Sequence, residues 1–142
     1  MKIAVLNGPN LNLQGKRQTN VYGTETLQEV YARLENKYPF IEFVFYQSNH
    51  EGDLIDKLHE IGFDHDGIVL NAGAYSHTSI ALADAIAAIT APVVEIHISN
   101  IFAREPFRHR SAIAANCVGS VCGLGLKGYE LAVEYFVLSR QK

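Results

Sequence analysis

Two short stretches of this sequence carry residues whose types and spacing suit proton transfer. The first is VEIHIS, in which Glu95, His97 and Ser99 alternate with apolar residues. An alternation of period two places the three polar side chains on one face of a β-strand, and a glutamate that is buried there needs a partner. Pairing with Glu95 would fix the tautomer of His97 and favour the charged imidazole. The alternative is a histidine that is simply satisfied within the core at the sheet edge.

The second stretch is NGPNLNLQGKRQTNVYGTET, from Asn7 to Thr26, which contains Arg17 and Tyr22. A tyrosine has an ordinary pKa of about 10, and lowering it by about three units takes roughly 4 kcal/mol of preferential stabilisation of the phenolate. A guanidinium that keeps its proton is a natural source of that stabilisation. Arg17 and Tyr22 are close enough along a loop to meet. The alternative is a surface tyrosine in the turn before Gly23.

A basic cluster in the segment FAREPFRHR comes shortly after VEIHIS, in a chain whose net charge is −3. Its arginines are Arg104, Arg108 and Arg110. Arginine holds carboxylates in a bidentate fork, so the cluster predicts an anion site, with solvated loop charges as the alternative. An RNA-binding surface would need interleaved aromatic residues and a basic background, which this chain lacks.

The elements that would position these residues alternate along the chain. Apolar runs predict strands at residues 2–7, 41–48, 67–71, 92–99 and 116–125. Apolar residues at helical spacing predict helices after a capping box of Thr26 and Glu29, from Leu54 to a stop at Gly62, over about 78–89, and from Tyr129 onward. This order indicates an α/β protein with a flavodoxin-like, doubly wound, five-stranded parallel sheet in a single domain, residues 1–142.

In that fold ligands bind beyond the carboxyl ends of the strands, at the switch in strand order. The polar residues of this chain gather at those positions, whereas the loops at the opposite edge hold turn residues and scattered charges. The set comprises Asn7, Asn10, Asn12, Arg17, Tyr22, Ser48, Asn49, His50, Asn71, Tyr75, Ser76, His77 and the three arginines. One edge of the sheet is therefore predicted to carry the chemistry.

Composition and charge narrow the class of protein. The chain has 142 residues, of which 48% are hydrophobic and 19% charged, as in a globular domain. A sequence pI of about 6.0 gives no reason to expect nucleic acid or a membrane surface as partner. The sequence enters a strand directly after Met1 and Lys2, so we expect no signal peptide and a cytoplasmic location. No histidine or cysteine motif predicts a metal site, and Cys117 and Cys122 are expected to be small buried hydrophobes.

The helix SIALADAIAAI is apolar nearly all round, with Asp84 as its only charge. One face of this helix can cover the sheet, and the other needs a cover as well, for which a second subunit is the economical source. We therefore expect a homo-oligomer in which Asp84 lies in or near a subunit contact.

Five segments in sequence order resemble the type II 3-dehydroquinate dehydratase (3-dehydroquinase) family. They are NGPNLNL with YG, QSNHEG, NAGAYSHTS, EIHISNIFAREPFRHRS and GLGLKGYELA, within about residues 3–137. The resemblance implies the flavodoxin-like fold, no cofactor or metal, and a dodecamer of trimers. It also implies a lyase that dehydrates 3-dehydroquinate to 3-dehydroshikimate, by anti elimination through an enolate. Whether this serves the shikimate pathway of aromatic amino acid biosynthesis or quinate breakdown stays open.

The resemblance also assigns roles to particular residues. It implies that Tyr22 is the base, Arg17 the essential arginine of a lid over about residues 12–24, and His97 the general acid with Glu95 beside it. It associates Asn12 with the enolate oxygen, through a water. The implied substrate contacts are Asn71, His77, Ile98, Ser99, Arg108 and, from a neighbouring subunit, Asp84. The pairs Tyr22 with Arg17 and His97 with Glu95 agree with this chemistry, because elimination next to a ketone needs a base on one side and a proton donor on the other.

Two departures from the family pattern concern the lid. Gln14 stands where a leucine is common, and Gln18 and Thr19 replace a Glu-Pro pair. Without the fixed backbone dihedral of proline we expect a lid that is less ordered without ligand, with its chemistry retained. The first alternative function is a flavin- or nucleotide-binding module on the same fold, which would need a Ser-, Thr- and Gly-rich first loop. The second is a non-catalytic assembly protein, which would not need Tyr22, Arg17 and His97.

Overall fold

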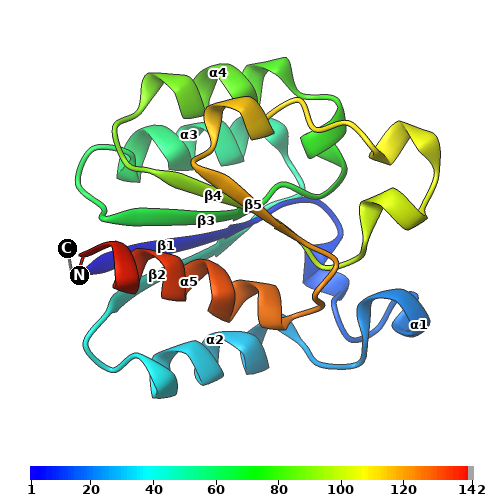
Figure 1. Ribbon diagram of the computed structural model, residues 1–142, viewed down its shortest axis with the longest axis horizontal. Coiled ribbons are helices and arrows are strands. Elements are labelled where there is room, and N and C mark those ends of the chain that lie inside the picture. Colours follow the sequence, from blue (N-terminus) through cyan, green and yellow to red (C-terminus); the bar gives the residue numbers. More distant parts are fainter. Residues whose placement is uncertain (141–142) are drawn as a thin grey trace.

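The computed structural model describes residues 1–140 as a parallel sheet covered by helices on both faces (Figure 1). The strands are β1 Lys2–Asn7, β2 Glu42–Gln47, β3 Gly67–Asn71, β4 Val93–His97 and β5 Gly119–Cys122. They form one five-stranded parallel sheet in the order β2-β1-β3-β4-β5. This is the flavodoxin-like order, so the predicted fold class is confirmed.

Four long helices cover the sheet in two layers. Helices α2 (Leu27–Lys37) and α5 (Lys127–Arg140) lie on one face, and α3 (Glu51–Ile61) and α4 (Ile80–Ala88) lie on the other (Figure 1). Alternate residues of β1 divide between the layers, since Ile3 and Val5 pack with α2 and α5 whereas Ala4 and Leu6 pack with α3 and α4. The continuous apolar run of this central strand thus follows from burial on both faces.

Local signals in the sequence set the helix ends. The capping box of Thr26 and Glu29 is formed at the start of α2. Helix α4 begins at Ile80, two residues later than expected, because the Ser79 side chain accepts a hydrogen bond from Leu82 N and caps it. Gly62 ends α3 with φ −69° rather than in the left-handed conformation. Glycine is needed there because a Cβ would lie 2.3 Å from Cγ2 of Ile89.

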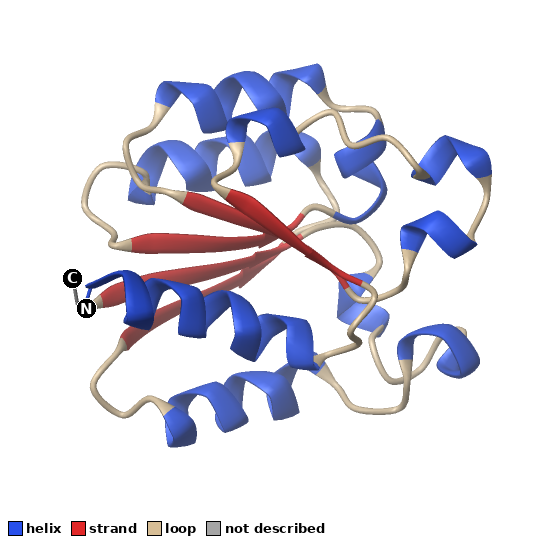
Figure 2. Cartoon of the chain, in the orientation of Figure 1, coloured by secondary structure: helices blue, strands red, loops and turns tan. Residues whose placement is uncertain are grey.

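The loops beyond the carboxyl ends of the strands contain short helical turns. These are α1 Thr19–Tyr22, η1 Leu11–Leu13, η2 Gly73–His77, η3 Ile101–Ala103, η4 Pro106–Arg108 and η5 Ala114–Asn116. All of them except η5 gather at the end of the sheet opposite the N-terminus (Figure 2), whereas η5 precedes β5 and packs against α4. Strand β5 is shorter than predicted, so Cys117 precedes it, and both cysteines are half-buried rather than buried. Within residues 1–140, every helix is too short or too polar to cross a membrane.

Candidate active site

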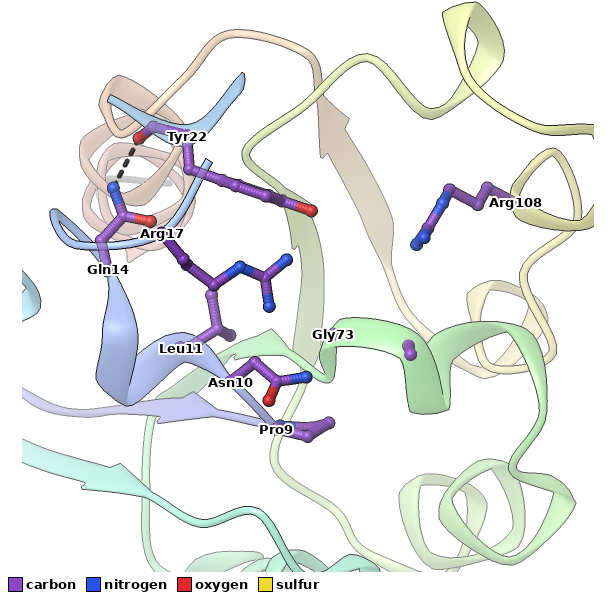
Figure 3. A pocket seen from close by; sticks show the side chains of 9 residues that line it. Pro9, Asn10, Leu11, Gln14, Arg17, Tyr22, Gly73 and Arg108 are labelled. Atoms are coloured by element: carbon purple, nitrogen blue, oxygen red, sulfur yellow. Dashed lines mark hydrogen bonds between the residues drawn. The ribbon is translucent and has the colours of Figure 1, made fainter. Parts of the chain in front are cut away.

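A cavity of about 120 Å³ lies beyond the carboxyl ends of β1 and β3 (Figure 3). It is lined by Pro9, Asn10, Leu11, Gln14, Arg17, Tyr22, Gly73, Ala74 and Arg108. These residues come from the loop after β1, the loop after β3 and the arginine-rich segment after β4. A single water needs about 10–15 Å³ on a comparable measure, so the cavity accommodates more than one water and presents two guanidinium groups to its contents.

Tyr22 projects over the cavity from the end of α1, with two arginines against it. The Arg104 guanidinium donates a hydrogen bond from Nη1 to the Tyr22 hydroxyl at 2.7 Å. The Arg17 guanidinium carbon lies 4.6 Å from the centre of the phenol ring. The predicted meeting of Arg17 and Tyr22 is therefore confirmed, and a second cation from a distant segment joins them. Two positively charged groups therefore contact this phenol, one at its hydroxyl and one at its ring.

The lid that carries Tyr22 is closed on itself. The Gln14 side chain is buried and its Nε2 donates a hydrogen bond to the main-chain oxygen of Tyr22. Gly15, with φ +90°, passes so close to the far arm that a Cβ would lie 2.6 Å from the oxygen of Thr24. Gln18 also has left-handed backbone dihedrals (φ 39°, ψ 51°). A residue before proline is pushed toward the extended region, so this backbone suits Thr19 better than proline.

Glu95 and His97 form the second predicted pair. Both are buried in β4, and His97 Nε2 lies 2.7 Å from Oε1 of Glu95. Ser111 Oγ donates to the same oxygen at 2.6 Å, and Ser120 Oγ donates to Oε2 at 3.0 Å. Burial acts to raise the pKa of Glu95, but the hydrogen bonds from His97, Ser111 and Ser120 outweigh it and hold this pKa below its usual value.

The ionised state of Glu95 decides the tautomer of His97. A carboxylate only accepts hydrogen bonds, so His97 Nε2 carries a proton and Nδ1 is the nitrogen left to exchange one with a ligand. The ring of His77 stacks on that of His97, with centroids 5.7 Å apart. His77 Nδ1 lies 2.8 Å from the main-chain oxygen of Arg110, which makes Nδ1 its protonated nitrogen.

Arginines also organise the segment after β4. Arg104 Nη1 donates to Ser99 Oγ at 3.2 Å as well as to Tyr22, so one guanidinium connects the lid with the end of β4. Arg108 Nε donates to Glu105 at 2.5 Å. Figure 3 shows its guanidinium and the Tyr22 hydroxyl pointing into the cavity from opposite sides. Arg104 and Arg108 therefore face the site, whereas Arg110 is exposed.

Asn71 belongs to a buried chain of hydrogen bonds at the ends of β1 and β3. Its Nδ2 donates to the Tyr129 hydroxyl at 3.1 Å, and its Oδ1 accepts from Gly73 N at 3.2 Å. The Tyr129 hydroxyl in turn donates to Asn7 Oδ1, and Asn7 Nδ2 donates to the Tyr31 hydroxyl. Because each donor in this series of hydrogen bonds has one acceptor, the series fixes the orientation of the Asn71 amide.

Several predicted site residues lie outside the cavity lining. His97, Asn71 and His77 lie at the neighbouring strand ends, and Ile98 lines an open groove on the other side of Tyr22. Asn12 is exposed and faces a separate hollow beside α2, whereas Asn10, two residues earlier, lines the cavity. Asp84 is exposed on α4, and Ile80 on the same helix is 74% exposed, in keeping with a face that needs cover.

Sequence reasoning missed three features of the site. The contact of Arg104 with Tyr22 joins residues that are 82 positions apart, so spacing gave no sign of it. Ser111 and Ser120, which donate hydrogen bonds to the Glu95 carboxylate, were not among the residues that the sequence singled out. Asn10 lies in the left-handed region (φ 68°), which asparagine tolerates, and this turn directs its side chain toward the cavity.

No group of three or more His, Cys, Asp or Glu side chains within residues 1–140 is arranged to hold a metal ion.

Comparison with known proteins identifies the family of the chain. Residues 1–137 match the family described as Dehydroquinase class II. The chain is 57% identical over 138 residues to a 3-dehydroquinate dehydratase of Exiguobacterium sp. strain AT1b, covering 96% of this chain and 94% of that protein. It is 56% identical over 142 residues to one of Bacillus licheniformis, covering 99% and 98%.

A solved structure agrees with the sequence relatives. The crystal structure of a type II dehydroquinase from Butyrivibrio crossotus superposes with a TM-score of 0.93 at 46% identity, covering 96% of this chain and 97% of the other. The lid, both predicted pairs and the arginine-rich segment all lie within residues 1–137, the range that the family matches.

Proposed function

Since the chain belongs to the class II dehydroquinase family, with the activity of a type II 3-dehydroquinate dehydratase, we propose how its residues divide the reaction. Tyr22 takes the proton next to the ketone, and His97 protonates the departing hydroxyl. The reaction converts 3-dehydroquinate to 3-dehydroshikimate in the shikimate pathway by anti elimination through an enolate. The observation that carries this division is the phenol of Tyr22, held between Arg17 and Arg104 at a cavity.

In the first step the Tyr22 phenolate removes the proton from the carbon beside the ketone. The electron pair of the C–H bond moves into a new carbon–carbon double bond, and the ketone oxygen becomes the enolate oxygen. A base is most effective when its pKa is near the working pH. Arg104 at the hydroxyl and Arg17 against the ring support the ionised phenol.

The enolate oxygen needs hydrogen-bond donors that are already in place. The sequence pointed to Asn12 for this role, but Asn12 faces a separate hollow and Asn10 lines the cavity. We therefore assign the enolate contact to the side-chain amide of Asn10, directly or through a water. Its position in the loop after β1 keeps it beside the base on the same segment of chain.

In the second step the enolate collapses, the carbon–oxygen bond to the leaving hydroxyl breaks, and His97 supplies the proton that makes the leaving group water. The buried carboxylate of Glu95 holds Nε2, so the proton comes from Nδ1. Arg108 and the main chain near Ile98 and Ser99 are proposed to hold the substrate carboxylate. Asn71 and His77 are proposed to contact the substrate at the neighbouring strand ends.

The assembly is proposed to be a dodecamer of trimers, in which Asp84 reaches the active site of a neighbouring subunit. The exposed face of α4 carries the apolar side chain of Ile80 together with the carboxylate of Asp84, and this face supports such a contact.

The division of roles can be tested by following the enone absorbance of the product. We expect Tyr22→Phe, Arg17→Ala and His97→Ala to fold normally and to lose nearly all turnover of 3-dehydroquinate. A Tyr22→Phe enzyme that keeps most of the wild-type rate would exclude this residue as the base, whatever the other two variants do.

A further inference from the structure

We propose that Gln14 is a positioning residue that latches the lid, so that the phenol of Tyr22 is held against its two arginines. The proposal rests on the role of Tyr22 as base, and it concerns a residue with no part in the chemical steps themselves. Gln14 lies eight residues before Tyr22 in the same loop. Its side chain points to the main chain of Tyr22 rather than to the ring (Figure 3).

The burial of Gln14 is unusual for its surroundings. Its side chain is 4% exposed, although Asn12, Leu13 and Lys16 beside it are all exposed. Burying an amide is unfavourable unless its polar groups find partners, and Nε2 finds one in the Tyr22 carbonyl oxygen. The hydrogen bond to the Tyr22 carbonyl therefore compensates for burying the Gln14 amide.

That bond joins the two arms of the lid. The main-chain hydrogen bonds of the lid are local, for example from Arg17 N to Leu13 O and from Tyr22 N to Gln18 O, each spanning four residues. The Gln14 amide spans eight. The close approach of Gly15 to the oxygen of Thr24 shows that the arms meet at the same place, so the latch closes the loop at its neck.

Tyr22 is consequently fixed at both ends. Gln14 holds its main-chain oxygen and Arg104 holds its hydroxyl oxygen, which leaves the ring stretched between them with Arg17 against its face. Electrostatic stabilisation of a phenolate falls with distance from the guanidinium groups. An unlatched lid keeps all the catalytic groups but holds the phenol less tightly among its cations.

The test compares Gln14→Leu, which keeps the volume and removes the donor, with Gln14→Glu, which keeps the shape and places an acceptor opposite the Tyr22 carbonyl. We expect trypsin to cut native enzyme faster after Lys16 and Arg17 in both variants. We also expect kcat to fall by about 3- to 10-fold, the factor for one neutral hydrogen bond, with KM little changed because the groups that hold the substrate are untouched. Gln28→Leu, an exposed glutamine on α2, is the matched control and should change neither readout.

Unchanged cleavage of the lid, or an unchanged kcat, in both Gln14 variants would overturn the proposal. The proteolysis requires no catalysis, so it reports on the latch even if Tyr22→Phe retained activity. Failure of the latch and failure of the assigned base are thus separate results.

Discussion

Arg104 donates its hydrogen bond to the hydroxyl oxygen of Tyr22, whereas Arg17 contacts the face of the same ring. The two arginines therefore act differently on one phenol, since only Arg104 meets the atom that carries the charge of the phenolate. A hydrogen bond to a charged group contributes about 1.5–3 kcal/mol, and we expect its loss to lower kcat/KM of Arg104→Ala by about 10- to 100-fold.

Arg104→Lys keeps the positive charge on a shorter side chain whose ammonium group does not match the position of the guanidinium nitrogen, so its loss should be intermediate. Lys16→Ala removes an exposed lid charge and serves as control. A kcat/KM that matches wild type in Arg104→Ala would contradict the assignment.

Matched substitutions can decide whether Asn10 or Asn12 contacts the enolate oxygen. Asn10 has a left-handed backbone, which glycine tolerates, so Asn10→Gly removes the amide without adding strain. We expect this variant to lose about tenfold or more in kcat because the enolate loses a donor. Asn12→Gly should stay near wild type. The reverse order in steady-state assays would return the role to Asn12.

The buried carboxylate of Glu95 should make stability depend on pH in acid. Its folded pKa lies below the ordinary value of about 4.3, so its contribution is present above that value and is lost as pH falls through the folded pKa. The thermal midpoint of wild type should therefore drop more steeply between about pH 5 and pH 3 than that of Glu95→Gln. Parallel curves for the two proteins would show that Glu95 is not held ionised.

The hydrogen-bond chain beneath the site should appear in stability measurements. Tyr129→Phe leaves both Asn7 Oδ1 and Asn71 Nδ2 without this partner in the core, which we expect to cost about 2 kcal/mol or more. Tyr31→Phe removes only the partner of Asn7 Nδ2 and should cost about 1 kcal/mol. Urea unfolding of the two variants gives the comparison. Equal losses would mean that Asn71 finds another acceptor.

The reach of Asp84 into a neighbouring site can be tested by mixing inactive subunits. Subunits with Asp84→Asn and subunits with Tyr22→Phe, reassembled together, should regain activity because some sites then combine an intact Tyr22 with an intact Asp84. A mixture of Tyr22→Phe and His97→Ala should stay inactive, since both residues belong to the same chain's site. If the first mixture also stays inactive while the subunits do exchange, Asp84 acts elsewhere.

The sequence predicted the sheet, its helices and the contact of His97 with Glu95, because these follow from local periodicity and from the fixed geometry of a strand. It also predicted the contact of Arg17 with Tyr22, because the two residues lie close together in one loop. It placed Arg104 at this edge of the sheet but could not predict its contact with Tyr22, because that contact depends on how two long loops fold over the sheet edge. Nor could it separate Asn10 from Asn12, since the left-handed turn that aims one of them is invisible in a run of similar residues.

The shared guanidinium of Arg104 gives the enzyme an interlock. Arg104 donates from one nitrogen both to Tyr22 in the lid and to Ser99 just after β4. A displacement of the lid would break the hydrogen bond to the phenol, so the position of the lid and the contact of the proposed base with this cation are coupled.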